Sequence, residues 1–233
     1  MATKYILSPI DLAERQENAA RVRAWNEQYT AETGRQRAAF VLTFGCQQNE
    51  ADSEKLAGMA ADMGYTITDT PDAADLILVN TCAIREHAEK KALSIIGQYK
   101  HLRAKNPDLI IGVCGCMTSQ EHRREELKQR YPYVTFTLGT SSLHQLPRVL
   151  WNTIHDRRRY ITSESDEDMT QTVAEGAPIR RASGYRAWVS VMYGCNNFCS
   201  YCIVPYVRGR ERSRRPEDII REVETLVAEG YRD

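Results

Sequence analysis

The sequence lacks any long hydrophobic run. No uninterrupted apolar stretch approaches the ~20 residues needed to cross a membrane, and residues 1–16 contain acidic side chains but no apolar core like that of a secretory signal. Net charge is missing too, because 31 basic residues balance 31 acidic ones. Overall charge therefore predicts no nucleic-acid partner, and any such surface must be local. These absences favour a cytoplasmic protein, in which thiols stay reduced.

Seven cysteines stand out against this background. Cys195, Cys199 and Cys202 form a CxxxCxxC array directly after an alternating, strand-like run over residues 187–193. An electron-transfer cluster takes four thiolates, whereas three thiolates leave one iron open to bind and activate a substrate. A zinc knuckle and three buried thiols are the alternatives, although zinc knuckles usually complete four ligands locally. The array favours an iron–sulfur cluster with an open iron.

Strand-like and helical patterns alternate through the first two thirds of the chain. Apolar residues recur at helical spacing over residues 56–63 and 84–105. Between and around these segments lie four apolar runs of strand length: residues 38–44, 76–79, 109–113 and 134–138. This alternation predicts an α/β domain over residues 36–153, with an open parallel sheet flanked by helices on both faces.

Three further regions flank this predicted domain. Residues 1–35 are expected to form a peripheral helical extension with a weak apolar stripe. That stripe consists of Ala20, Val22 and Trp25. Residues 154–184 change from basic to acidic and then to glycine and proline, which indicates a linker. Residues 185–233 contain a strand, the cysteine loop and a helix opened by Pro216, which predicts the first β/α unit of a second, incomplete domain.

A second set of cysteines follows the predicted strands. Cys46, Cys82 and Cys116 each come directly after an apolar run. Because the carboxyl ends of parallel strands share one edge of the sheet, we expect the three thiols to meet there and hold a metal site. The alternative is that cysteines are common in buried strands. Cys114 lies two residues before Cys116, and Gly115 between them could turn the chain so that only Cys116 points to the site.

Four separated motifs contain the cysteines of both sets. They are TFGCQQNEADSE at 43–54, NTCAIRE at 80–86, GCMTSQ at 115–120 and YGCNNFCSYCIVPYVRGR at 193–210. These motifs resemble the methylthiotransferase family of radical S-adenosylmethionine enzymes, and within it the MiaB-type tRNA branch. The resemblance runs from about residue 38 to the last residue. The residues that follow Cys46 and Cys82 differ from those typical of the ribosomal-protein and threonylcarbamoyl-adenosine branches.

The resemblance implies two 4Fe–4S clusters and S-adenosylmethionine as cofactors. The auxiliary cluster, which delivers sulfur, would be held by Cys46, Cys82 and Cys116. The cluster that cleaves S-adenosylmethionine would be held by Cys195, Cys199 and Cys202, with Tyr201 lining the adenine of the cofactor. The implied substrate is N6-isopentenyladenosine beside the anticodon in the tRNA anticodon stem-loop, and an electron donor and a sulfur source would be partners. No catalytic side chain is expected, because cofactors carry the difficult step.

Five arginines alternate after the cysteine loop: Arg208, Arg210, Arg212, Arg214 and Arg215. We expect them to bind RNA phosphates, the alternative being a solvated, partly salt-bridged segment. A complete β/α barrel needs ~250 residues, so we also expect these 233 residues to be inactive toward tRNA by themselves. A methylthiotransferase with another tRNA adenosine or a ribosomal protein as substrate, an iron–sulfur redox module without radical chemistry, and a zinc-stabilised RNA-binding or scaffold protein stay open as alternatives.

Overall fold

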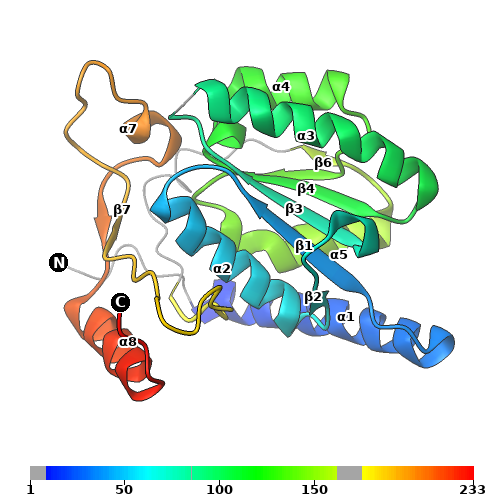
Figure 1. Ribbon diagram of the computed structural model, residues 1–233, viewed down its shortest axis with the longest axis horizontal. Coiled ribbons are helices and arrows are strands. Elements are labelled where there is room, and N and C mark those ends of the chain that lie inside the picture. The colour runs from blue at the N-terminus through cyan, green and yellow to red at the C-terminus, as the bar shows by residue number, and fades with distance from the viewer. Residues whose placement is uncertain (1–8, 85, 162–174) are drawn as a thin grey trace.

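A six-stranded parallel sheet forms the centre of the computed structural model, which describes residues 9–84, 86–161 and 175–233 (Figure 1). The strand order is β2-β1-β3-β4-β5-β6. The predicted open parallel sheet is confirmed, and the four predicted strands are β1, β3, β4 and β5. The strands are β1 (Ala38–Thr43), β2 (Thr66–Ile67), β3 (Leu76–Thr81), β4 (Ile110–Gly115), β5 (Phe136–Leu138) and β6 (Tyr160–Ile161).

Helices cover both faces of this sheet. In Figure 1, α3 and α4 lie on one face, while α1, α2 and α5 lie on the other. The bounds are α1 (Pro9–Thr33), α2 (Gln47–Asp62), α3 (Glu86–Lys105), α4 (Glu121–Arg130) and α5 (Leu146–Asp156). Three short 3₁₀ turns complete this part: η1 (Pro71–Ala73), η2 (Cys116–Ser119) and η3 (Leu143–Gln145).

Alternation along the central strands builds a core on each side. In β3, Leu76 and Leu78 pack beneath α1, α2 and α5, while Ile77 and Val79 pack beneath α3 and α4; all four are fully buried. A strand buried on both faces needs an unbroken apolar run, because successive side chains point to opposite sides. This explains why the central strands are visible in the sequence.

The N-terminal helix α1 is part of the first core. It packs along α5, and its buried side chains include Ala19 and Val22, with Trp25 partly buried beside them. The expected stripe was wrong at one position, because Ala20 is exposed and Ala19 takes the inward place. The spacing from Ala19 to Val22 keeps both side chains on one helical face.

The segment predicted as a linker, residues 154–184, is partly structured. Helix α5 continues to Asp156, and β6 adds an edge strand beside β5. The acidic residues of this segment lie outside the described residues. Farther on, the chain crosses α2: the Arg180 amide donates to the Glu54 carbonyl oxygen at 3.0 Å, and the Pro178 backbone lies directly over Gly58.

The second part of the chain is a β-ribbon that encloses the cysteine loop and a short helix, followed by a longer helix. β7 (Met192–Tyr193) pairs antiparallel with β8 (Arg212–Ser213), and between them lie the cysteine loop and α7 (Val204–Val207); α8 (Pro216–Ala228) follows. The strand expected over residues 187–193 is therefore limited to β7, the two residues that pair with β8 after the loop.

The chain ends beside the start of that same segment. The Ala187 amide donates to the Asp233 carbonyl oxygen at 2.8 Å, and the Tyr185 carbonyl oxygen accepts from the Arg232 and Asp233 amides. Asp233 is thus bonded to the residues on both sides of Arg186, which is the hydrogen-bond pattern of neighbouring parallel strands. A strand, a helix and a parallel return are the elements of the predicted β/α unit.

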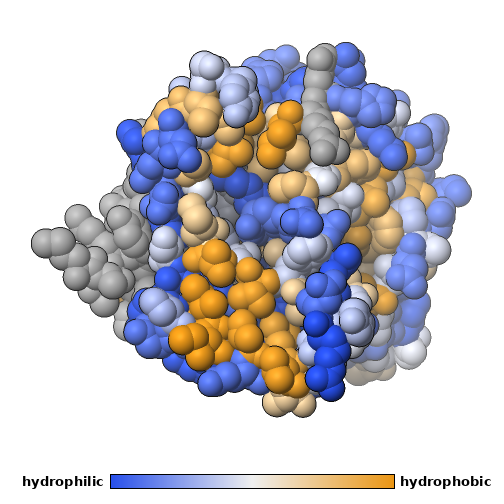
Figure 2. Space-filling model, turned by 60° about the vertical axis from the view of Figure 1, so that its left-hand side comes forward, coloured by the Kyte–Doolittle hydropathy of each residue, from blue (hydrophilic) through white to orange (hydrophobic). Residues whose placement is uncertain are grey.

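An apolar stripe on α8 stays exposed. Ile220, Val223 and Val227 share one helical face, and their side chains are 56%, 42% and 58% exposed. Figure 2 shows an apolar patch low on this side of the molecule, where α8 lies. Among the described residues, no helix has both the length and the apolar character required to cross a membrane.

The crossing at Gly58 generates a prediction. A Cβ at this position would lie 2.2 Å from the Pro178 carbonyl oxygen, so Gly58→Ala must displace the crossing segment. We expect the free energy of unfolding to fall by about 1–3 kcal/mol, measured by urea denaturation, with faster hydrogen exchange at the Arg180 amide.

Gly97 in α3 provides the matched control, because an added Cβ there meets nothing within 4 Å. Gly97→Ala should raise the free energy of unfolding by about 0.5–1 kcal/mol, the ordinary helix-propensity gain. Equal effects of the two substitutions would show that the crossing segment is not held against α2.

Candidate metal centre

Three cysteines lie at the carboxyl edge of the sheet. Cys46 is the N-cap residue of α2 directly after β1, Cys82 follows β3, and Cys116 opens η2 after β4. The three strands are neighbours in the sheet, with β3 in the middle. The loops are close together, since a Cβ on Gly45 would lie 2.7 Å from the Cβ of Cys82. Residues 34 or more positions apart in sequence thus share one edge, as the strand order predicts.

A glycine turn separates Cys114 from Cys116. Cys114 is fully buried in the core beneath α1, α2 and α5, and burial raises the pKa of its thiol. Gly115 has a φ of 94°, and an added Cβ would lie 2.4 Å from the Thr81 carbonyl oxygen. The left-handed turn, which only glycine adopts readily, redirects the chain. Cys116 then lies within electrostatic range of Cys82 and Arg208.

Each sulfur at this edge has a polar or charged neighbour. Cys46 stands at the N-terminus of α2, and its sulfur donates to Oδ1 of Asn49 at 3.3 Å. The Cys82 sulfur accepts a hydrogen bond from the Ile84 amide at 3.4 Å. Cys116 interacts with the Arg208 guanidinium. This donor set suits a cationic metal group, because thiolates are the ligands that iron–sulfur clusters use.

Two buried asparagines fix the loops that carry these cysteines. Asn49 donates to the Thr81 carbonyl oxygen at 2.9 Å and to Oδ1 of Asn80 at 3.2 Å, and its own Oδ1 accepts from Cys46 at 3.3 Å. Asn80 donates in return to the Asn49 carbonyl oxygen at 2.8 Å. Sequence reasoning missed both residues. Their presence inside two of the cysteine motifs was the available signal.

A cation from the second part of the chain reaches this edge. Arg208 follows α7, which packs on η2, and its Nη2 lies 2.9 Å from the Asp52 carboxylate of α2. Arg208 is 7% exposed and Asp52 is 3% exposed. Burial opposes the charge of Arg208, but Asp52 together with Cys116 and Cys46 outweighs it, and the guanidinium pKa is raised. Burial raises the pKa of Cys116 to about 11, with Arg208 acting in the opposite direction.

The expectation that the alternating arginines bind RNA phosphates is wrong for most of them. Arg208 pairs with Asp52, and Arg212 is buried, donating to the Arg208 carbonyl oxygen. Arg214 pairs with two glutamates and Arg215 with an aspartate of α8. Only Arg210 of the five is both exposed and without a carboxylate partner among the described residues, and its guanidinium lies 4.5 Å from the Phe198 ring centroid.

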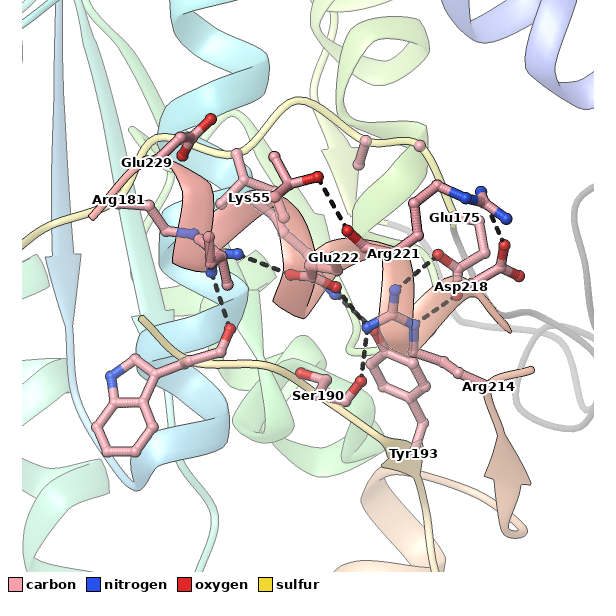
Figure 3. A pocket seen from close by; sticks show the side chains of 16 residues that line it. Lys55, Glu175, Arg181, Ser190, Tyr193, Arg214, Asp218, Arg221, Glu222 and Glu229 are labelled. Atoms are coloured by element: carbon pink, nitrogen blue, oxygen red, sulfur yellow. Dashed lines mark hydrogen bonds and ion pairs between the residues drawn. The ribbon is translucent and has the colours of Figure 1, made fainter. Parts of the chain in front are cut away.

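A cavity of about 390 Å³ lies where α8 faces α2 and the crossing segment. Figure 3 shows Arg181 and Arg214 both reaching Glu222, at 2.7 and 2.6 Å. Arg181 also pairs with Glu54 of α2 at 2.9 Å, and Arg214 with Glu175 at 2.6 Å. Each guanidinium is compensated, so the cavity is a charged junction between the two parts of the chain.

The CxxxCxxC loop is more open than the sheet edge. The Cys195 amide donates to the Gly209 carbonyl oxygen at 3.1 Å, and the Cys202 amide to that of Cys199 at 2.9 Å. Cys199 is exposed, Cys195 and Cys202 are half-buried, and Tyr201 is 91% exposed. Throughout the described part of the chain, no group of three or more His, Cys, Asp or Glu side chains is arranged as a ready site for a metal ion.

Comparisons with known proteins assign a class to this arrangement. Residues 189–233, which contain the loop and α8, match the Radical SAM superfamily. Residues 38–139, which carry the sheet and its three edge cysteines, match the family described as "Uncharacterized protein family UPF0004". An α/β domain of this kind followed by the start of a radical SAM domain defines a two-part protein of the radical S-adenosylmethionine class.

Individual relatives narrow the class. The chain is 46% identical over 224 residues to the tRNA-2-methylthio-N(6)-dimethylallyladenosine synthase of Caldicellulosiruptor saccharolyticus, covering 96% of this chain and 47% of that protein. It is 45% identical over 231 residues to the synthase of the same name from Clostridioides difficile, covering 99% and 48%. The chain thus spans about half the length of the curated relatives it matches. Its sequence is similar to the N-terminal half of methylthiotransferases of the MiaB type.

The different surroundings of the cysteines predict different reactivity in metal-free protein. With a pKa of about 11, Cys116 is ionised to only about a thousandth at pH 8, and only the thiolate is alkylated. Cys199 is exposed. We expect iodoacetamide at pH 8 to modify Cys199 at least ~100-fold faster than Cys116.

Timed alkylation followed by mass spectrometry of the peptides measures both rates. The Cys116 rate should rise about tenfold per pH unit while the pH stays below about 11, because ionisation of a thiol with a raised pKa grows until that pH. Similar rates for the two cysteines at pH 8 would contradict the burial of Cys116.

Proposed function

We propose that this chain provides the N-terminal half of a tRNA methylthiotransferase that forms 2-methylthio-N6-dimethylallyladenosine beside the anticodon. The observation that carries the proposal is the pairing of two three-cysteine sets in one chain, one on the sheet edge and one on the exposed loop. The names of the relatives, tRNA-2-methylthio-N(6)-dimethylallyladenosine synthase, support the substrate. The reaction would take place in the cytoplasm, with tRNA, an electron donor and a sulfur source as partners.

We assign the two sites to two 4Fe–4S clusters. Cys46, Cys82 and Cys116 would hold the auxiliary cluster. Cys195, Cys199 and Cys202 would hold the cluster that binds S-adenosylmethionine, with Tyr201 lining its adenine. When bound, these groups supply the radical and the sulfur that acid–base side chains cannot provide for an unactivated aromatic carbon. Three thiolates at each site leave one iron open for a non-protein ligand.

The chain's own residues have positioning roles in this proposal. The asparagine pair Asn49 and Asn80 orients the loops of Cys46 and Cys82. The Ile84 amide donates to the Cys82 sulfur. Burial of Cys82 and Cys116 keeps water from the auxiliary site, whereas the exposed Cys199 and Tyr201 leave the loop accessible to a cofactor. We assign residues 36–153 to the domain of the auxiliary site and residues 185–233 to the domain of the cofactor loop, with residues 1–35 as an N-terminal extension and residues 154–184 as the linker.

Iron analysis after anaerobic reconstitution tests the two-cluster assignment. The unmodified chain should bind about eight irons, and Cys82→Ala or Cys199→Ala should each retain about four, because each removes one ligand of a different cluster. Cys114→Ala is the matched control and should keep all of them, since Cys114 lies in the core. Halved iron in Cys114→Ala would transfer the ligand role from Cys116 to Cys114.

A chimera tests the activity. Joining this chain to the remaining half of the Caldicellulosiruptor saccharolyticus relative should yield a protein that methylthiolates tRNA carrying N6-isopentenyladenosine. In this chimera Cys82→Ala should still release 5′-deoxyadenosine from S-adenosylmethionine but form no methylthio product, while Cys199→Ala should do neither. Zinc in place of iron, or a chimera that binds iron but releases no 5′-deoxyadenosine, would favour a scaffold or a redox module instead.

A further inference from the structure

Arg208 is the charged side chain through which the second part of the chain reaches the three-cysteine edge. Helix α7 packs on η2, and Thr140 donates to the Val207 carbonyl oxygen at 2.7 Å, which fixes the end of α7 beside Cys116. Arg208 follows immediately and interacts with both Cys116 and Cys46. A cation from one part of the chain is thus held beside the thiols of the other.

The surroundings of this cation are largely excluded from solvent. Arg208 and Asp52 are both nearly buried, and their ion pair spans 2.9 Å. Coulomb interactions are several-fold stronger in such an environment than in water. Arg212, also buried, donates to the Arg208 carbonyl oxygen at 3.1 Å. Arg208 and Asp52 are therefore opposite charges placed beside the same set of sulfurs.

We propose that Arg208 raises, and Asp52 lowers, the reduction potential of the cluster held by Cys46, Cys82 and Cys116, so that docking of the second part tunes this cluster. The inference rests on the proposed function for the cluster itself. The reasoning is electrostatic: one-electron reduction adds one negative charge, which a nearby cation stabilises and a nearby anion destabilises. Net charge, hydrogen bonds to sulfur and solvent exposure are what set such potentials.

A purely structural role of the ion pair between Arg208 and Asp52 predicts a different result. Arg208→Gln and Asp52→Asn both remove the same ion pair, so a structural role predicts that they change the cluster in the same direction. The electrostatic role predicts opposite directions, because one variant removes the cation and the other leaves it unbalanced. The sign of the shift separates the two roles without relying on activity.

The experiment is a redox titration of the auxiliary cluster by electron paramagnetic resonance. Replacing the three loop cysteines by alanine leaves this cluster as the single signal. The replaced residues are Cys195, Cys199 and Cys202. We expect Arg208→Gln to shift the potential to a more negative value, Asp52→Asn to a more positive one, and Arg210→Gln, whose guanidinium is exposed over Phe198, to leave it unchanged.

Shifts of the same sign, or no shift in either variant, would overturn the proposal. Should Arg208→Gln hold no cluster, Arg208→Lys decides: a cluster with a nearly unchanged potential supports the charge, and a lysine variant that also holds none contradicts it. The iron content of the chain that lacks only the three loop cysteines distinguishes this failure from failure of the proposed function. Four irons bound to the edge cysteines with no response to Arg208 would refute the tuning alone, whereas no iron there would refute the cluster assignment.

Discussion

The ion pair between Arg208 and Asp52 joins the two parts of this molecule and holds a cation of the second part beside the edge cysteines. Both side chains are nearly excluded from water, and removing one partner of such a pair costs about 3–5 kcal/mol because the other charge stays buried. Helix α2 supplies the carboxylate and also begins at Cys46. Within one helical turn of Asp52, the same helix places Glu54 in an ion pair with Arg181 and Lys55 in a hydrogen bond to the Tyr193 hydroxyl. One helix therefore both carries a thiol and receives the second part.

Much of the fold could be predicted from the sequence because the central strands are buried on both faces. β3 begins with four apolar residues, 76–79, β4 contains only apolar residues and glycine, and the rule that parallel strands share a carboxyl edge placed Cys46, Cys82 and Cys116 at one edge of the sheet. The edge strands β2 and β6 escaped prediction, since two residues carry no period. Helix α4 escaped as well, because it buries only Leu127 against the core and is otherwise largely charged.

The arginines after the cysteine loop show where sequence reasoning fails. Their alternation resembles a phosphate-binding surface, but the partner of Arg208 lies 156 residues earlier in the chain and one partner of Arg214 lies 39 residues earlier. Charge patterning along a segment contains no information about carboxylates that folding brings from so far away. The asparagine pair under the cysteine loops was missed for the same reason, since each residue acquires its role only through the other.

The unequal exposure of the two cysteine sets has a consequence for oxidative damage. Sulfenic acid and disulfide formation follow thiolate character and access to solvent. Cys199 is exposed, Cys46, Cys195 and Cys202 are half-buried, and Cys82 and Cys116 are buried. In air, the thiol of Cys199 would therefore be oxidised before those of Cys82 and Cys116. Oxygen would modify the loop while these two thiols of the α/β domain stay intact.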